Sequence, residues 1–526
     1  YCIENKIDYF NPLQYLTNIF YKSALVKSEK LIGSLKYLNL DHYSNQIEVN
    51  AILRYRLYSI LFLEELIIKI DKRIGIKKIV LSGWDEYAGQ YSNKNYFISK
   101  IVKTLFKKKK IIFLSKNESL PAPKITIHKF RIKGIKKRNN TKYILLSNLG
   151  YNFFRIVKNL KIKNTFFITE FDKNINLIKR FIYKILKVQF FKFEKLDIKD
   201  RKFKIPKIKM KYNNKIILNF LIERINQEKN NIIQSISKTE AIDEIFTQHN
   251  ICSVFSNMSR GIYGYYLEAA TKRKINSFCI PHGTLPQHFN KHDIIYKKII
   301  AEAVLSDRAG FVAVQSKIAN EFFKKTYKKP KVKKICSGNL IFSENAQTKN
   351  KKINGKILYA VTLRNFQNLQ FLGVEMFYEF ISNLTFLEHF SKKNNTDVIV
   401  KLHPSAKDCI NELKRIYPRL KFTNKKIDQV LKSVDFTISF SSTSIEDSLY
   451  FYKPVILFDQ WKRYQHCWCE KNFNKKNEAI YYLTKKEEIA KCMETIYKSN
   501  NASFNKYIYP GVAKNNISKF ESLIKN

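Results

Sequence analysis

Four hydroxyl side chains stand in a row at Ser441, Ser442, Thr443 and Ser444, between a β-branched run and a segment with helical spacing. The first N–H groups of a helix have no partner inside the helix and lie at the positive end of its dipole, so they favour a phosphate. A single Ser or Thr is also the ordinary N-cap of a helix. Because four hydroxyls exceed what a cap requires, we predict that these residues bind the phosphates of a ligand.

Three further residues suit a phosphorylated nucleotide. Glu446, one turn into the same helix, can accept hydrogen bonds from ribose hydroxyls or close a capping box. His403 follows a predicted strand at 397–402, and Arg364 follows one at 356–361. An imidazole or guanidinium at a strand end can donate to phosphate oxygens, although a structural histidine and a solvated arginine are the alternatives. We predict that all three contact a phosphorylated nucleotide.

His282 is the candidate for acid–base chemistry. Pro281 and Gly283 flank it directly after a predicted strand at 278–280, and they force a tight turn that holds the imidazole at the edge of its domain. An imidazole titrates near neutral pH, so it suits the role of a general base toward an acceptor hydroxyl. A turn histidine without a role is the alternative, and two more histidines follow in the same segment.

Acidic residues also follow the first predicted strand, at 78–82. Asp85 and Glu86 lie at the edge where an acceptor would bind, and we predict them as acceptor contacts. Metal chemistry has less support, because the His/Cys cluster at 466–469 has no second pair at zinc-finger spacing and no Asp-x-Asp pair ends a strand. We expect no metal and no other cofactor, since the nucleotide-activated donor is a substrate.

The elements that position these residues alternate in type along the chain. Short runs of β-branched and aromatic residues, expected as strands, separate longer amphipathic segments, expected as helices. Expected strands are 78–82, 111–115, 143–147, 165–169, 251–255, 278–280, 311–314, 356–361, 397–402, 420–423, 435–440 and 454–458. Expected helices in the second half are 373–392, 428–433 and 444–452. Such alternation predicts an α/β fold of doubly wound, mostly parallel sheets, whose ligands bind beyond the carboxyl ends of the strands.

The 526 residues are sufficient for two hydrophobic cores, and a polar stretch at 349–355 marks the boundary between them. The lysine-rich stretch at 196–215 is interpreted as a connection or insertion. We predict a helical N-terminal extension at 1–75, a Rossmann-like acceptor domain at 76–348, a Rossmann-like nucleotide-donor domain at 349–490 and a helical segment at 491–526 that packs back on the acceptor domain.

The chain is strongly basic, with 96 Lys and Arg against 44 Asp and Glu and a net charge of +52. This charge suits an anionic membrane surface or a phosphorylated substrate, although an AT-rich genome also produces a lysine-rich composition. Basic runs at 107–110, 131–138 and 324–334 are scattered between the predicted strands and helices, without an RNP, zinc-finger or homeodomain pattern. We therefore rank an anionic membrane surface above nucleic acid and expect no nucleic-acid partner.

Cysteine usage and hydropathy bear on location. The eight cysteines show no paired framework, which is typical of a chain kept reduced in a cytoplasm. No stretch of about 20 apolar residues occurs, and the segment at 55–70 is interrupted by charged residues and predicts an amphipathic helix. We expect a cytoplasmic protein held peripherally on the inner face of the plasma membrane.

Five motifs in this order resemble those of the GT-B-fold transferases of cell-envelope polymers, which include CDP-glycerol glycerophosphotransferases, capsule Kdo transferases and bacterial sialyltransferases. The motifs are PHGT at 281–284, ICSGNLIF at 335–342, ILYAVTLR at 357–364, KLHP at 401–404 and DFTISFSSTSIEDSLYFYKPVI at 435–456. The resemblance implies a GT-B-like fold, in which two Rossmann-like domains face each other across a cleft.

The resemblance also implies roles for the residues named above. His282 would take a proton from the acceptor hydroxyl as that hydroxyl attacks the anomeric carbon of the donor sugar, with inversion of configuration and without a metal. Glu446 would contact the ribose of the donor. The residues in contact with its phosphates would be His403, Ser442, Thr443 and Arg364.

The chain departs from the glycerophosphotransferase pattern at three positions. Leu285 stands where a proline is usual, Phe440 where an acid is usual and Tyr452 where a glycine is usual. These changes favour a sugar nucleotide, CMP- or CDP-linked, as the donor. The sequence therefore predicts a glycosyltransferase that acts on a lipid-linked or growing surface polysaccharide such as capsule or lipopolysaccharide. A CDP-glycerol-type glycerophosphotransferase, a sugar-nucleotide 2-epimerase of the same fold and a non-catalytic carbohydrate or nucleic-acid binder are the alternatives.

Overall fold

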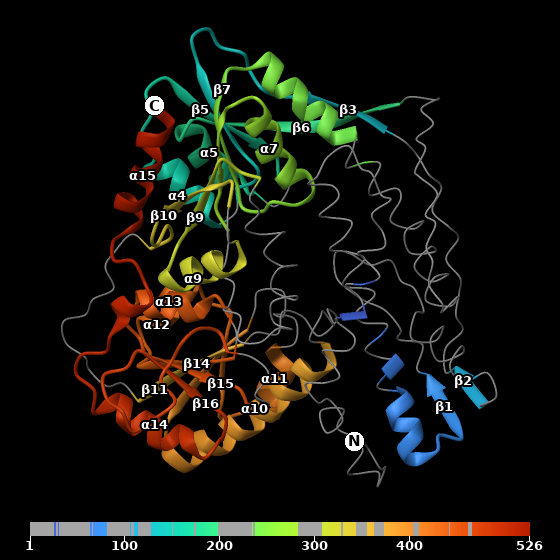
Figure 1. The fold of residues 1–526 in the computed structure, drawn as a ribbon, viewed down its shortest axis with the longest axis vertical. Helices are drawn as coiled ribbons and strands as arrows, with labels where there is room; N and C mark the ends of the chain where they lie inside the picture. Colours follow the sequence, from blue (N-terminus) through green and yellow to red (C-terminus); the bar gives the residue numbers. More distant parts are fainter. Residues whose placement is uncertain are drawn as a thin grey trace.

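Two large sheets with helices on both faces organise the described part of the chain (Figure 1). The computed structural model describes residues 26–27, 30, 61, 64–65, 67–81, 106, 110–113, 128–149, 151–172, 175–197, 234, 237–281, 308–327, 330–342, 355–361, 373–402, 410–440, 442–460 and 465–525. Among these residues, no helix is long and apolar enough to span a membrane. The predicted α/β fold with doubly wound, mostly parallel sheets is confirmed.

The larger sheet has eight strands in the order β10-β9-β8-β7-β4-β5-β6-β3. Its strands are β3 (His128–Lys133), β4 (Lys142–Leu146), β5 (Thr165–Glu170), β6 (Val188–Asp197), β7 (Ile251–Ser256), β8 (Asn276–Cys279), β9 (Phe311–Val314) and β10 (Lys333–Cys336). Neighbouring strands pair in parallel, except that β3 pairs antiparallel with β6 at one edge. From β4 the chain builds outward through β5 and β6 and then returns to add β7 to β10, so the strand order reverses between β4 and β7.

Both faces of this sheet are apolar, so helices cover both. On β4, Tyr143 and Leu145 belong to one hydrophobic cluster, whereas Ile144 and Leu146 belong to another. Alternation of this kind is what a strand buried on both faces requires. The covering helices are α7 (Gly261–Lys272) and α9 (Lys317–Thr326) on the first face, and α4 (Tyr151–Asn159), α5 (Leu177–Ile185) and α15 (Ala513–Lys525) on the second.

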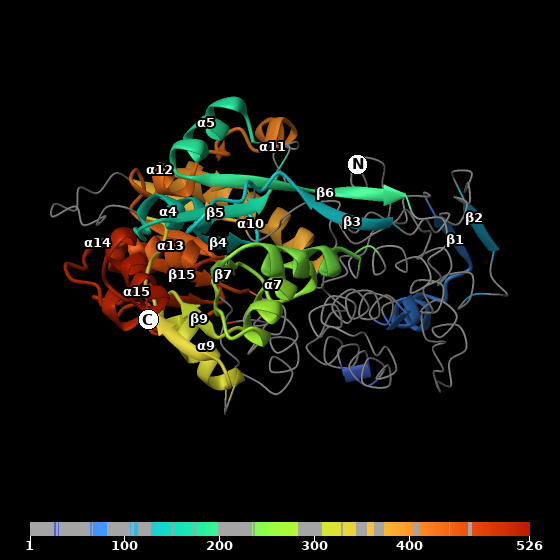
Figure 2. The ribbon, with the colours of Figure 1, turned by 90° about the horizontal axis from the view of Figure 1, so that it is seen from above.

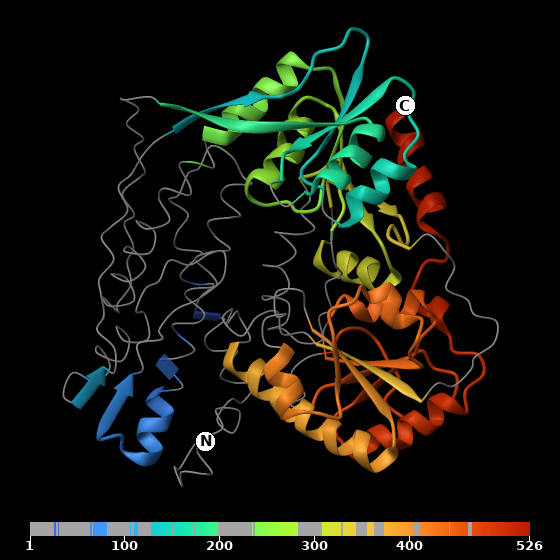
Figure 3. The same ribbon diagram turned by 180° about the vertical axis from the view of Figure 1, so that it is seen from behind.

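Helix α15 packs on the eight-stranded sheet although the six-stranded sheet precedes it in the chain (Figures 1 and 3). The ring of Phe520 lies edge-on to Phe255 and Phe278, at 5.8 and 5.4 Å between ring centroids. The main-chain N–H of Lys161 donates to Glu521 Oε1 at 2.6 Å. Helix α15 is therefore part of the second apolar layer of this sheet.

The second large sheet has six strands in the order β13-β12-β11-β14-β15-β16, and all pairs are parallel. Its strands are β11 (Lys356–Ala360), β12 (Asp397–Lys401), β13 (Lys421–Thr423), β14 (Phe436–Ser439), β15 (Val455–Phe458) and β16 (Ile480–Leu483). Its helices are α10 (Gly373–Asn394), α11 (Ile410–Ile416), α12 (Ile427–Leu431), α13 (Ser444–Tyr450) and α14 (Glu488–Tyr497). This is the Rossmann strand order, with its reversal between β11 and β14.

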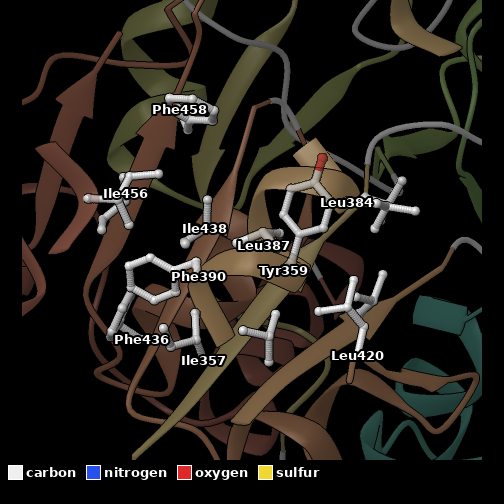
Figure 4. Packing of buried hydrophobic residues seen from close by; sticks show 14 of the residues in the cluster. Ile357, Tyr359, Leu384, Leu387, Phe390, Leu420, Phe436, Ile438, Ile456 and Phe458 are labelled. Atoms are coloured by element: carbon white, nitrogen blue, oxygen red, sulfur yellow. The ribbon is translucent and has the colours of Figure 1, made fainter. Parts of the chain in front are cut away.

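One core layer of the six-stranded sheet packs its central strands against α10 and α14, and Figure 4 shows the part at α10. Ile357 and Tyr359 from β11 and Ile438 from β14 pack with Leu384 and Leu387 of α10, and all five side chains are buried. Burial of each such side chain contributes roughly 1.5–3 kcal/mol of transfer free energy. The layer therefore fixes the strands whose carboxyl ends carry the predicted site.

A separate pair of parallel strands, β1 (Lys78–Leu81) and β2 (Lys110–Phe113), precedes the eight-stranded sheet. Most of the predicted N-terminal extension at 1–75 lies outside the described residues, and within it residues 67–74 are helical. A short 3-10 helix, η4 (Phe504–Lys506), precedes α15.

Some sequence expectations were wrong. Four strands had not been predicted: β3, β6, β10 and β16. The stretch at 196–215, interpreted as a connection, begins inside β6, because Leu196 pairs with Lys129 across the antiparallel edge. The basic run at 131–138 begins inside β3, where basic and apolar residues alternate. The run at 324–334 begins in the last turn of α9, directly after the buried Phe322 and Phe323.

Candidate functional site

The reversal of strand order in the six-stranded sheet positions the predicted phosphate-binding turn. At such a reversal the connections after the two central strands leave toward opposite faces, which opens a crevice at the carboxyl ends. Strand β14 is one of the two central strands, and Phe440, Ser442, Thr443 and Ser444 follow it before α13 continues. The predicted hydroxyl run therefore lies at the switch point of this sheet, apart from Ser441, which lies outside the described residues.

The hydroxyl groups of this turn have two different environments. Ser442 Oγ accepts a hydrogen bond from the main-chain N–H of Ser444 at 3.2 Å and donates to Ser444 Oγ at 3.2 Å. Ser442 thus satisfies one of the first N–H groups of α13, as the N-cap alternative required. Thr443 is exposed, and its side chain makes no capping hydrogen bond. One hydroxyl is used by the helix, and another faces outward at the switch point.

Two carboxyl groups occupy the first turn of α13, and burial changes their charge. Burial raises the pKa of Glu446 to about 8, opposed by a hydrogen bond from Ser316. Burial and the charge of Asp428 raise the pKa of Asp447 to about 7. Near neutral pH both groups therefore hold a proton for much of the time, and the negative charge beside the hydroxyl turn is reduced. An anion at the start of α13 would meet the helix dipole with less repulsion.

Glu446 also makes a hydrogen bond between the part of the chain that follows β9 of the eight-stranded sheet and α13 of the six-stranded sheet. The hydroxyl of Ser316, which follows β9, donates to Glu446 Oε1 and accepts from the N–H of Ala319 at 2.9 Å as the N-cap of α9. Both Glu446 and Ser316 are buried. The apolar contact around this pair includes Ile318 of α9 and Ile445 of α13. The structure thus places Glu446 at the contact between the sheets, and the predicted ribose role stays a prediction.

A second hydrogen-bond chain runs from the same helix to the end of β8. The hydroxyl of Tyr450 donates to the carbonyl oxygen of Gln315, which follows β9. The side-chain amide of Gln315 donates to the carbonyl oxygen of Pro281 at 2.6 Å. Pro281 directly precedes His282, which lies outside the described residues. The backbone beside the predicted base is therefore held by a residue that α13 itself contacts.

Several predicted site residues lie outside the described residues: His282, His403, Ser441, Arg364, Asp85 and Glu86. Their described neighbours show the elements that they follow. Leu402, which precedes His403, follows β12, and Val361 follows β11. Both strands end at the same edge as β14, since all three are parallel.

Sequence reasoning missed the residues that join the two sheets, Ser316, Gln315 and Tyr450. It also missed a polar pair at the switch point of the eight-stranded sheet. There the amide of Asn148, after β4, donates to Asn257 Oδ1, after β7, at 3.1 Å. A usable signal existed for this pair, because each asparagine comes within two residues of the end of a predicted strand, at 143–147 and 251–255.

No group of three or more His, Cys, Asp or Glu side chains could hold a metal ion among the residues that the structure describes. Within the His/Cys cluster at 466–469, Cys467 is buried, and Cys469 Sγ accepts from the Gln465 amide at 2.9 Å. Burial raises the pKa of both thiols. These cysteines are neutral side chains packed in the described structure.

No protein-family model and no curated protein matches the chain. Among solved structures it is similar to the UDP-GlcNAc 2-epimerase of Methanocaldococcus jannaschii, with 12% identity, 73% of this chain and 99% of that chain covered, and a TM-score of 0.40. It is similar to a variant of the wall teichoic acid polymerase TagF, with 12% identity, 74% and 89% covered, and a TM-score of 0.41. A UDP-glucosyltransferase from Polygonum tinctorium gives 9% identity, 74% and 100% covered, and a TM-score of 0.36. The named activities differ, so this likeness selects no reaction.

Proposed function

We propose that the protein is a glycosyltransferase that moves a sugar from a nucleotide-activated donor, CMP- or CDP-linked, to a hydroxyl of a lipid-linked or growing surface polysaccharide. One observation supports this most directly: the carboxyl-end edges of two doubly wound sheets meet through Ser316, Gln315 and α13. Ligands of such sheets bind beyond those edges. Two substrates held on the two edges would meet where the sheets join.

The donor is assigned to the six-stranded sheet. Thr443 and Ser444 at the start of α13 would bind its phosphates, together with His403 and Arg364 from the neighbouring strand ends. The raised pKa values of Glu446 and Asp447 support this assignment, because neutral carboxyl groups repel phosphate less than carboxylates do.

The acceptor is assigned to the eight-stranded sheet. His282, which directly follows Pro281 in the chain, would take the proton of the acceptor hydroxyl as the hydroxyl oxygen attacks the anomeric carbon. The bond from that carbon to the phosphate oxygen would break, and the nucleotide would leave with the negative charge. A lipid-linked acceptor would bring the protein to the inner face of the plasma membrane, where its charge of +52 favours anionic lipid.

Thermal stabilisation by CMP, CDP, UDP, GDP and ADP tests the donor site. The variants are Thr443→Val and His403→Ala, and Ser522→Ala on the exposed side of α15 is the matched control. A nucleotide at 100 times its Kd stabilises the folded chain by about 2.7 kcal/mol. We expect one nucleotide to raise the melting temperature of the wild type and the control, with a smaller rise in both site variants.

The same nucleotide then identifies the reaction. Release of that nucleotide from its sugar conjugate only when a saccharide acceptor is present would support the transferase. Conversion of the sugar nucleotide without an acceptor would assign a 2-epimerase instead, and transfer from CDP-glycerol would assign a glycerophosphotransferase. If no nucleotide stabilises the wild type, or if all variants respond equally, the donor site is wrongly placed.

A further inference from the structure

Helix α5 exposes an apolar surface to solvent. Eight large apolar side chains are exposed among the described residues, and five of them lie on this one helix. They are Leu177 (79% exposed), Ile178 (72%), Phe181 (65%), Ile182 (39%) and Ile185 (65%). A contiguous group of this kind marks an interaction surface, whereas single exposed apolar residues are ordinary.

The apolar side of α5 points away from the protein. At 3.6 residues per turn, Leu177, Phe181 and Ile185 follow one another on one face, with Ile178 and Ile182 beside them. Tyr183 is the buried residue of the helix and packs into the core of the eight-stranded sheet. A surface helix usually turns its apolar stripe toward the core. Helix α5 has the opposite orientation.

Contacts on both ends hold α5 in this orientation. Asn176 Oδ1 accepts from the N–H of Lys179 at 3.0 Å as the N-cap. The guanidinium of Arg180 lies 4.5 Å from the ring centroid of Phe171. The ring of Tyr183 packs edge-on to aromatic rings of the layer below, at 5.7 and 5.9 Å between centroids. These contacts fix α5 with its apolar face toward solvent.

Basic residues surround this face. Lys179, Arg180, Lys184 and Lys187 are exposed, and the sequence contains no Asp or Glu from 173 to 193. An apolar helix face flanked by lysine and arginine is the composition of helices that lie in the interface of an anionic bilayer. A protein partner would have to supply an acidic surface around an apolar centre.

The apolar surface continues into a hollow of about 220 Å³ at the end of α5. The residues that line it are Val157, Leu160, Lys161, Ile162, Thr165, Phe167, Ile185, Leu186 and Lys187. The hollow thus shares Ile185 with the exposed face of α5 and Lys187 with its basic surroundings.

The same side of the molecule carries a second exposed site. Figure 2 shows α11 of the six-stranded sheet and α5 along one side, which faces the viewer in Figure 3. On α11, Ile416 is 58% exposed beside Lys414 and Arg415.

We infer that α5, with its five exposed apolar residues and its flanking lysines, docks the protein on an anionic lipid bilayer. The apolar side chains enter the boundary between headgroups and acyl chains, and the lysines lie among the anionic headgroups. The assignment uses residues outside the proposed donor site and stands without the proposed reaction.

Co-sedimentation with vesicles tests this inference. Vesicles of phosphatidylcholine with phosphatidylglycerol are compared with vesicles of phosphatidylcholine alone. We expect the wild type to bind the anionic vesicles and the Ile178→Ser/Phe181→Ser variant to bind them about tenfold or more weakly, because two large apolar groups no longer leave water. Lys184→Gln/Lys187→Gln should weaken binding by about fivefold per lysine and reduce its dependence on salt. Ile74→Ser, which changes an isoleucine that is 49% exposed elsewhere, is the matched control.

Circular dichroism and the melting temperature verify that each variant is folded. The rise in melting temperature that the nucleotide causes should be equal in the wild type and in the α5 variants. Failure of the donor site would abolish that rise and leave vesicle binding intact, so the two ideas fail separately. Absence of vesicle binding by the wild type, or equal binding by the Ile178→Ser/Phe181→Ser variant, would overturn the inference. Light scattering that shows a wild-type dimer lost in this variant, without vesicle binding, would make α5 a protein interface instead.

Discussion

The buried carboxyl group of Glu446 makes the stability of the protein depend on pH. Its pKa is about 8 in the folded chain and 4.5 in its ordinary environment. Between these values the folded chain binds the proton and the unfolded chain does not, so the free energy of unfolding falls as pH rises. The contribution is fully present below about pH 4.5 and is lost as pH approaches about 8.

The magnitude follows from linkage. A group protonated only in the folded state lowers the free energy of unfolding by about 1.4 kcal/mol for each pH unit. From about pH 5.5 to about pH 7.5 the loss is therefore roughly 2.7 kcal/mol. Glu446 is 6% exposed, so little of this is screened by solvent. In Glu446→Gln the amide does not titrate, and this part of the pH dependence should disappear.

Urea unfolding at the two pH values measures this effect. The fluorescence of Trp468 reports on the surroundings of α13, because its ring stacks on Tyr507 at 5.3 Å in the same apolar cluster as Ile445. The matched control is Glu494→Gln, a change of an exposed glutamate on α14, which should keep the wild-type dependence. Equal pH dependence in wild type and Glu446→Gln would refute the buried, protonated state of Glu446.

Three further outcomes are expected. Gly338→Ala should lower the melting temperature more than Gly75→Ala does. Both glycines have positive φ, but only a Cβ at Gly338 would lie 2.8 Å from a side-chain nitrogen, that of Asn516 on α15. Equal shifts in melting temperature would contradict this. Phe520→Ala should lower the free energy of urea unfolding by about 3–5 kcal/mol, and a loss below about 1 kcal/mol would show that α15 contributes little to the core. Gln315→Leu removes the donor to the carbonyl of Pro281, so turnover should fall about tenfold to a hundredfold while the nucleotide-induced rise in melting temperature is unchanged.

The inner parallel strands were predictable because they are buried on both faces and contain continuous apolar runs. Strand β9 was predicted with its observed bounds, and the strands from β11 to β15 were predicted within one residue at each end. Strand β6 was missed because lysine and glutamate alternate with its apolar residues at the antiparallel edge, which hides the pattern of an inner strand. The runs of apolar residues in the sequence therefore predicted the central strands of each sheet better than the strands near its edges.

The candidate site was predictable only where one segment contains it. The hydroxyl turn of Ser442 and Thr443 could be placed because the strand before it and the helix after it are both visible in the sequence. The contact of Ser316 with Glu446 joins residues 130 positions apart, and nothing in either segment points to the other. A polar residue after a predicted strand can be placed at the edge of its own sheet from the sequence. The residue of another sheet that it contacts can be identified only from the structure.

The eight-stranded sheet cannot be completed before the six-stranded sheet has been synthesised, because α15 packs on the first and follows the second in the chain. Residues of α15 cover Phe255 and Phe278, which the ribosome produces long before α15 itself. At a synthesis rate of roughly 5–20 residues per second, the interval between β8 and α15 is on the order of 10–50 s. During that time the eight-stranded sheet lacks the part of its apolar cover that α15 provides over Phe255 and Phe278, and exposed apolar surface of this kind binds chaperones or aggregates.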